Sequence, residues 1–432
     1  MAQIRPFAGI RFSSAAGADN SDFIAPPYDV LDAAGKAKLL AKSPFNIVAI
    51  DLPHVPPKQL GPPAAYEAAA ATMQKWLDSG VLVKGGRRAT YAYEQTFDID
   101  GHPHHRRGII VLVKLTPFGV DVTPHEQTHA GPIEDRLQLM HATGAQLSPV
   151  FGLFMDRGDA ILSKVFASVS KPACIATLDG VSNKLWEIID ASLEDELQIA
   201  MRDKKIYIAD GHHRYTTALH YQRQMEEKNG GPLPPADAAN WCMFVLINGE
   251  DSGLRVLATH RLVGGVKDWT LDAFCANAAE AFEVTKIGFT GEPEAIAAQL
   301  SELGKGSIGV YSQKKLCTLR LRDGLRMKSL EPDKSESWRS LDVAVYQRAI
   351  YDDIIARRFQ SVASAGPTTG YTADARDAIT RVDKGEFQAA FLLNPTPIRA
   401  LAELGEVGEV MPQKSTFFFP KLATGLVINP LR

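Results

Sequence analysis

The sequence predicts an α+β fold. Three observations lead to this prediction: an apolar strand at 205–209 that is followed at once by a helical pattern, a β-hairpin within 90–115, and mixed strands and helices after residue 240. With 432 residues the chain exceeds what one hydrophobic core usually supports, so we expect two or three domains. The expected regions are an N-terminal α+β region at 1–120, a central core at 121–240 and a C-terminal mixed α/β region at 241–432.

The N-terminal region contains two clear local patterns. An Ala-rich segment at 64–80 predicts a helix that ends at a capping glycine. Two strand-like segments, 90–99 and 106–115, lie on either side of the turn dipeptide Asp100-Gly101, and this pattern predicts a β-hairpin. The histidines next to this turn could be metal ligands, but we interpret them as part of a solvated loop: His102, His104 and His105.

After the central core, local patterns predict further strands and helices. The strands are expected at 241–248 and 254–262, and the helices near 271–282, 293–303 and 341–359. No internal repeat or low-complexity tract interrupts them.

Composition excludes several classes of protein. The net charge of −3 without any basic block argues against extended nucleic-acid binding, which needs a basic surface. No segment approaches the ~20 apolar residues of a membrane span, and the N-terminus lacks the apolar core of a signal peptide. We therefore expect a cytoplasmic protein that binds neither nucleic acid nor membrane. The four cysteines show no metal-ligand spacing, so we interpret them as small buried hydrophobic residues in a reducing compartment.

The segment 206–215 is the most informative part of the sequence. A short β-forming run ends at Asp210, and apolar residues recur at helical spacing from Tyr215, so a helix is expected to begin at or just after Gly211. Glycine lets the backbone turn sharply and approach a ligand. The first N–H groups of such a helix point outward with the positive end of its dipole, which predicts an anion site.

The residues in the first turn of this helix strengthen that prediction. His212, His213 and Arg214 follow Asp210 within four positions. Cations at a helix N-terminus oppose the dipole unless an anion neutralises both. Phosphate is the natural anion for such a group of donors. Asp210 could hold a Mg²⁺ ion through a carboxylate oxygen.

The motif Asp210-Gly211-His212-His213-Arg214 resembles the signature of the ParB/sulfiredoxin-like fold in the form found in ADP-dependent free-serine kinases. Two more segments resemble those kinases in the same order along the chain: Pro124-His125-Glu126-Gln127 and Pro412-Gln413-Lys414-Ser415-Thr416. The whole chain also resembles a widespread prokaryotic family known as a domain of unknown function. The residues that carry this second resemblance are Arg5-Pro6-Phe7, Ala25-Pro26-Pro27-Tyr28-Asp29-Val30, His125-Glu126-Gln127-Thr128, Gly131-Pro132, Glu134-Asp135-Arg136 and Lys414-Ser415-Thr416.

The kinase resemblance implies a reaction and a set of roles. It implies a ParB/sulfiredoxin-like catalytic core at 121–240 that transfers a phosphoryl group from ADP or ATP, with Mg²⁺, to free L-serine, giving O-phosphoserine. Glu126 would be the general base, and Asp210 would share the catalytic role. The phosphates would bind Gly211, His212, His213 and Arg214, and the serine would bind His125, Lys414, Ser415 and Thr416.

Alternative interpretations remain for several of these residues. Glu126 could be a capping or salt-bridged surface residue, and 415–419 could be an edge strand. Glu134-Asp135-Arg136 could form an ion-pair network that supports Glu126, or could contact phosphate through Arg136. The Pro-Pro-Tyr-Asp segment at 26–29 is interpreted as structural, with a role at the edge of the site as the alternative.

Other functions use the same fold differently. The site could activate water and act as an O-phosphoserine phosphatase, or could bind nucleotide without catalysis, as a ParB-like module does. Sulfiredoxin chemistry is set aside, because it needs a cysteine in the turn where this chain has His212. Glu126 and Asp210 also stand farther apart in the chain than in the compact kinases, and 1–120 has no counterpart there. The donor, the exact acceptor and the oligomeric state therefore stay open.

Overall fold

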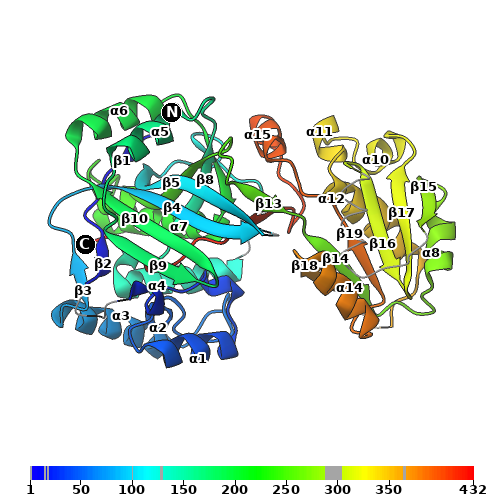
Figure 1. Cartoon of the computed structure of the whole chain (residues 1–432), viewed down its shortest axis with the longest axis horizontal. Coiled ribbons are helices and arrows are strands. Elements are labelled where there is room, and N and C mark those ends of the chain that lie inside the picture. Colours follow the sequence, from blue (N-terminus) through cyan, green and yellow to red (C-terminus); the bar gives the residue numbers. More distant parts are fainter. Residues whose placement is uncertain are drawn as a thin grey trace. The chain divides into compact units, whose positions relative to one another are not determined.

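The computed structural model describes residues 2–13, 16, 19–99, 101–126, 130–287, 304–362 and 366–432. The chain forms two compact units: the first contains the residues up to Leu254 together with Pro420–Arg432, and the second is Arg255–Phe419 (Figure 1). Both units mix helices and sheets, as the predicted α+β class requires. The predicted division at residues 120 and 240 stays a prediction.

The first unit is built on one mixed sheet with the strand order β6-β11-β8-β12-β5-β4-β10-β9, to which β1 adds by pairing with β5. Most neighbours are antiparallel, but β11 runs parallel to β6, and β12 runs parallel to β8. Two small sheets flank it. The strands of this unit are β1 Ile4–Arg5, β2 Ile10–Phe12, β3 Leu82–Lys84, β4 Thr90–Ile99, β5 His102–Lys114, β6 Val122–Thr123, β7 Ala145–Gln146, β8 Val150–Phe154, β9 Cys174–Leu178, β10 Val181–Ile188, β11 Ile206–Asp210, β12 Trp241–Asn248 and β21 Asn429–Pro430.

Helices cover this sheet, and the unit has two main apolar cores. In Figure 1, α5 and α6 lie above the sheet and α1–α3 lie below it. One core joins α5, α6 and α7 to the sheet, and the other joins α1–α4. The helices are η1 Asn20–Asp22, η2 Tyr28–Val30, α1 Ala33–Lys42, α2 Val48–Asp51, α3 Pro63–Asp78, α4 Ala130–Thr143, α5 Ala160–Ser168, α6 Ala191–Met201, α7 His212–Asn229 and η3 Ala238–Asn240.

The second unit contains an antiparallel sheet with the order β15-β17-β16-β19-β14-β18 and a separate pair, β13 with β20. Its strands are β13 Arg255–Leu257, β14 His260–Gly264, β15 Phe282–Ile287, β16 Ser307–Ser312, β17 Lys315–Leu321, β18 Thr368–Thr372, β19 Ala389–Leu392 and β20 Phe417–Phe419. Its helices are α8 Leu271–Ala278, α10 Leu325–Leu330, α11 Glu336–Arg339, α12 Asp342–Val345, the π-helical η4 Tyr346–Ile355, α13 Ala356–Arg358, α14 Ala375–Asp383 and α15 Ile398–Glu406.

Most predicted elements are confirmed. The 64–80 pattern forms α3, the hairpin forms β4 and β5, 241–248 forms β12, and 341–359 forms the continuous run from α12 to α13. Two predictions were wrong in extent. The 254–262 run divides into β13 and β14, which pair in different sheets, and the helix expected at 271–282 ends at Ala278 because Phe282 enters β15. The helix expected at 293–303 and Asp100 of the hairpin turn lie outside the described residues.

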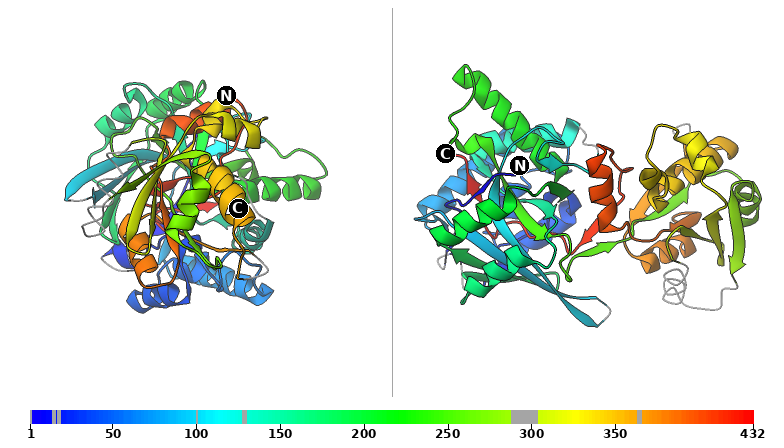
Figure 2. Two further views of the ribbon diagram at one scale, coloured as in Figure 1. Left: turned by 90° about the vertical axis from the view of Figure 1, so that its right-hand side faces the viewer. Right: turned by 90° about the horizontal axis from the view of Figure 1, so that it is seen from above.

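The histidines near the hairpin turn lie on a strand, and not in a loop as predicted. The turn is so tight that His102 already pairs with Ile99 in the β4–β5 ladder. His105 faces Thr96, and the ring of His104 lies 5.6 Å from that of Phe97. Figure 2 shows this hairpin extending beyond the neighbouring strands of its sheet.

Three cysteines are buried as predicted, namely Cys242, Cys275 and Cys317, whereas Cys174 is partly exposed. No helix in the described part of the chain is both long and apolar enough to cross a membrane.

Candidate active site

The predicted strand–glycine–helix turn is confirmed. Strand β11 ends at Asp210, Gly211 adopts φ 92° at the N-cap position, and α7 begins at His212. Among the described residues no side chain caps this helix. The N–H groups of a first helical turn lack partners inside the helix, so they and the helix dipole offer a site to an anion.

This turn needs glycine for two reasons: the positive φ of the backbone and the close approach of the Arg214 side chain. A Cβ atom on Gly211 would lie 2.8 Å from Nε and 2.9 Å from Cζ of Arg214. The guanidinium group is held there, because its Nη1 donates to the carbonyl of Pro149 and its Nη2 lies 3.7 Å from Oδ2 of Asp210. Arg214 therefore folds back over the turn, and its side chain is only 11 % exposed.

We expect Gly211→Ala to lower the free energy of unfolding by about 1–3 kcal/mol, because alanine at positive φ is strained and its methyl group displaces Arg214. Gly80→Ala is the matched control, since Gly80 has φ 73° and open space around its Cβ position. Denaturant unfolding of both variants separates the two causes. Equal losses would show that the contact with Arg214 contributes nothing.

Asp210 is held as a carboxylate by cations. Its Oδ1 accepts the N–H of Gly211 at 2.9 Å, and its Oδ2 lies 3.3 Å from Nζ of Lys421. Burial by itself would raise the pKa of Asp210, but Lys421 and Arg214 outweigh it and hold the pKa well below its usual value. Asp210 is therefore ionised at neutral pH.

Lys421 is a site residue that the sequence analysis missed. The carbonyl of Pro420 accepts from Arg106 at 2.6 Å, and that of Lys421 accepts from Gln95 at 3.1 Å. Both donor side chains are only 1 % exposed. No local pattern marks Lys421, because it stands 211 positions after Asp210 in the sequence and only folding brings the two residues together.

The histidines of the two motifs touch each other. The N–H of His125 donates to Nε2 of His212 at 3.2 Å, and Nδ1 of His125 donates to the carbonyl of Ile208 at 2.5 Å. The two rings lie 4.6 Å apart and nearly perpendicular. Because Nε2 of His212 accepts, its ring proton is on Nδ1, and Nδ1 is the nitrogen that could donate to a phosphate.

His212 should make stability depend on pH. Burial, followed by the nearby His125, lowers the pKa of His212 well below its usual value. In the unfolded chain this histidine takes up a proton near its ordinary pKa of ~6.5, whereas in the folded chain it stays neutral to lower pH. The contribution of His212 to the free energy of unfolding is therefore full above pH ~6.5 and falls by about 1.4 kcal/mol per pH unit below it. Urea unfolding between pH 7.5 and 5.5 measures the slope. His212→Gln should reduce this slope, whereas the exposed control His102→Gln should not, and an unchanged slope in His212→Gln would contradict this assignment.

Glu126 follows His125 directly. Its Oε1 lies 3.8 Å from Nε2 of His125, and its side chain is 22 % exposed. The contact between His125 and His212 therefore places Glu126 near the start of α7. Gln127 and Thr128 of the same motif lie outside the described residues, and the role of Glu126 as a base stays a prediction.

The third predicted segment belongs to the second unit. Lys414 is exposed there, while Ser415 is buried, its hydroxyl donates to the carbonyl of Pro412, and its own carbonyl accepts from Thr396 at 2.7 Å. Thr416 precedes β20, so 417–419 do form the strand that was the alternative interpretation. The substrate-binding role of Lys414, Ser415 and Thr416 stays a prediction.

A buried ion-pair network surrounds Arg136. Its Nε donates to Asp135 Oδ2 at 2.9 Å, its Nη1 donates to the carbonyl of Asp51 at 2.6 Å, and its guanidinium group stacks 4.0 Å from the ring centre of Tyr28. Asp135 and Arg136 thus form an ion-pair network, whereas Glu134 is exposed and accepts a hydrogen bond from Gln138. Support of Glu126 by this network stays a prediction. Tyr28 is a structural part of the network.

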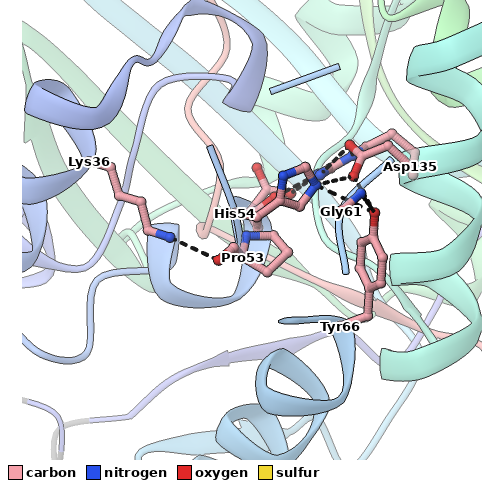
Figure 3. Close-up of polar contacts among 8 residues, drawn as sticks. Lys36, Pro53, His54, Gly61, Tyr66 and Asp135 are labelled. Carbon is pink, nitrogen blue, oxygen red and sulfur yellow. Dashed lines mark hydrogen bonds and ion pairs between the residues drawn. The ribbon is translucent and has the colours of Figure 1, made fainter. Parts of the chain in front are cut away.

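The same network reaches the N-terminal helices through Asp135. Figure 3 shows His54 and Tyr66 meeting this carboxylate, with His54 Nε2 and the Tyr66 hydroxyl each 2.8 Å from Oδ1. On the other side, Asp51, Arg136 and Arg214 line a small cavity of about 40 Å³. The network thus lies directly behind the Asp210–Arg214 turn.

Metal binding at Asp210 has little support in the side chains around it. In the part of the chain that the structure describes, no three His, Cys, Asp or Glu residues are grouped so that they could hold a metal ion. Both oxygens of Asp210 already face cationic or N–H groups. The residues present therefore do not fit direct Mg²⁺ coordination by Asp210.

Residues 4–344 match the family described as "Protein of unknown function (DUF1015)", and the chain belongs to that family. No curated protein matches the sequence. Among solved structures, a conserved hypothetical protein from Pyrococcus furiosus is 16 % identical, with a TM-score of 0.36 over 73 % of this chain and 95 % of that one. A free serine kinase in complex with AMP is 15 % identical, with a TM-score of 0.36 over 73 % of this chain and 92 % of that one. The predicted family membership is confirmed; similarities this low carry no function to this chain.

Proposed function

We propose that this member of the family is a nucleotide-dependent phosphotransferase that phosphorylates the hydroxyl group of free L-serine. One observation carries the proposal: the His125-Glu126 motif lies against the Asp210–Arg214 turn, through the bond from the His125 N–H to His212. A carboxylate is thereby brought near an anion-binding helix start, and those are the two parts that phosphoryl transfer to an alcohol requires.

The phosphate groups of ADP or ATP would bind at the N-terminus of α7. Backbone N–H groups and the positive end of the helix dipole favour phosphate there. His213 is partly exposed in the first turn and can donate to a phosphate oxygen. Mg²⁺ would enter with the nucleotide phosphates, where it neutralises charge that develops during transfer.

Glu126 would start the reaction as the general base. Its carboxylate takes the proton of the serine hydroxyl, and the serine oxygen then forms a bond to the terminal phosphorus of the nucleotide. The bond from that phosphorus to the bridging oxygen breaks, which releases AMP from ADP or ADP from ATP together with O-phosphoserine. His125, fixed by Ile208, would position Glu126 and contact the serine.

The assignment of a ParB/sulfiredoxin-like core belongs to the same proposal. The features that support it are the buried strand β11, the turn at Gly211 and helix α7, which begins directly after the turn. They lie within the first unit.

The test is to incubate the full-length protein with Mg²⁺, L-serine and labelled ADP or ATP, and to follow O-phosphoserine. A parallel reaction starts from O-phosphoserine alone. Transfer from either nucleotide supports the proposal. Release of inorganic phosphate from O-phosphoserine without transfer would select a phosphatase, and nucleotide binding without any turnover would select a ParB-like binding module. Either of these results would overturn the kinase assignment.

A further inference from the structure

We infer that Lys421 is a phosphate-binding residue that takes the place of a divalent metal ion at Asp210. The inference rests on the proposed function, and it adds a residue that lies far from every motif in the sequence. It also replaces the expectation that Asp210 coordinates Mg²⁺ directly.

The first argument is that the Asp210 carboxylate is already occupied. Oδ1 accepts the N–H of Gly211 at 2.9 Å, while Oδ2 lies 3.3 Å from Lys421 Nζ and 3.7 Å from Arg214 Nη2. Mg²⁺ needs oxygen ligands at ~2.1 Å in near-octahedral geometry. A dication bound to Oδ2 would stand next to two fixed positive charges, which repel it strongly in a partly buried site.

The second argument concerns how Lys421 is placed. Its backbone is anchored through the carbonyls of Pro420 and Lys421, which accept from the buried Arg106 and Gln95. Its side chain remains 22 % exposed, twice the value of the Arg214 side chain. An ammonium group has three N–H donors, so it can contact Asp210 and a phosphate oxygen together.

The third argument concerns the cations at the turn. Lys421 and Arg214 both face Asp210, and Arg214 also lies near the buried carboxylate of Asp51. The N-terminus of α7 adds its positive dipole end at the same place. Because Arg214 is directed inward to Pro149, Lys421 is the cation that is placed to meet a phosphate. The partly exposed ammonium group of Lys421 and the dipole end together favour an anionic ligand.

The first test measures ADP binding by isothermal titration in the presence of EDTA. Wild-type protein should bind ADP without metal, Lys421→Met should bind at least 10-fold more weakly, and Lys421→Arg should retain most of the affinity. Lys184→Met is the matched control, since Lys184 pairs with Glu94 at 3.0 Å in the same unit, away from Asp210. Circular dichroism checks that each variant is folded. Unchanged ADP affinity in folded Lys421→Met would overturn the inference.

The second test uses Mn²⁺ as a probe, by electron paramagnetic resonance without nucleotide. Wild-type protein should show no site at Asp210, whereas Lys421→Met should gain a Mn²⁺ site that disappears again when Asp210→Asn is added. A Mn²⁺ site in the wild type that Asp210→Asn removes would overturn the inference. Failure of serine phosphorylation would affect the proposed function alone. If no form binds ADP, the nucleotide proposal and the phosphate-binding role of Lys421 both fail, and the Mn²⁺ titration then decides only whether Lys421 excludes a metal ion from Asp210.

Discussion

Glu126→Gln is expected to lower the rate of phosphoryl transfer by at least about 100-fold, because general-base catalysis contributes factors of this size or larger. The amide keeps the shape of the side chain but cannot accept the hydroxyl proton. Nucleotide affinity should change little, since the phosphates are expected at the N-terminus of α7. The measurements are the initial rate of O-phosphoserine formation and the Kd for ADP.

The control for this substitution is Glu134→Gln on the same part of the chain. Glu134 is exposed and accepts a hydrogen bond from Gln138 on helix α4. It should keep the wild-type rate. If Glu126→Gln also kept the full rate, Glu126 would not be the base. If it lost ADP binding together with the rate, Glu126 would belong to the nucleotide site.

Arg136→Met is expected to lower the free energy of unfolding of the first unit by about 3–5 kcal/mol, since removing one partner of a buried ion pair leaves the other charge uncompensated. Methionine retains much of the length and apolar character of the arginine side chain. Asp135, which is fully buried, would lose two contacts from the guanidinium group. Denaturant unfolding that follows tyrosine and tryptophan fluorescence measures the loss.

Arg107→Met is the matched control for this prediction. Arg107 pairs with Asp159 at 2.7 Å, but both side chains are partly exposed, so the loss should stay within about 1 kcal/mol. Adding Asp135→Asn to Arg136→Met should recover part of the stability, because it removes the unpaired charge. Similar losses in the Arg107 and Arg136 variants would mean that burial of the network has no energetic consequence.

The parts of the site that the sequence predicted correctly are those whose signals are local. Burial of β11, the sharp turn at Gly211 and the start of α7 all follow from residue types within a few positions. The proximity of Glu126 to this turn was an expectation from the order of the motifs. It became visible only through the bond between the His125 N–H and His212.

The parts that the sequence could not predict depend on pairing between distant segments. Lys421 reaches Asp210 because buried Arg106 and Gln95 hold its backbone, and no periodicity encodes such a contact. Similarly, the sequence around His54 and Tyr66 shows no motif that marks a buried contact, yet both side chains contact Asp135. The strand position of His102 was missed for another reason: the turn before it is tight enough that pairing starts at once.

The first unit is assembled from two stretches of chain, with the whole second unit encoded between Leu254 and Pro420. Ribosomal synthesis therefore delivers Asp210 and the start of α7 long before it delivers Lys421. Until then, Arg106 and Gln95 lack the carbonyls of Pro420 and Lys421 to which they donate in the finished protein. A nascent chain arrested before Pro420 lacks Lys421 of the proposed phosphate site, so we expect the proposed activity only after translation has passed the second unit.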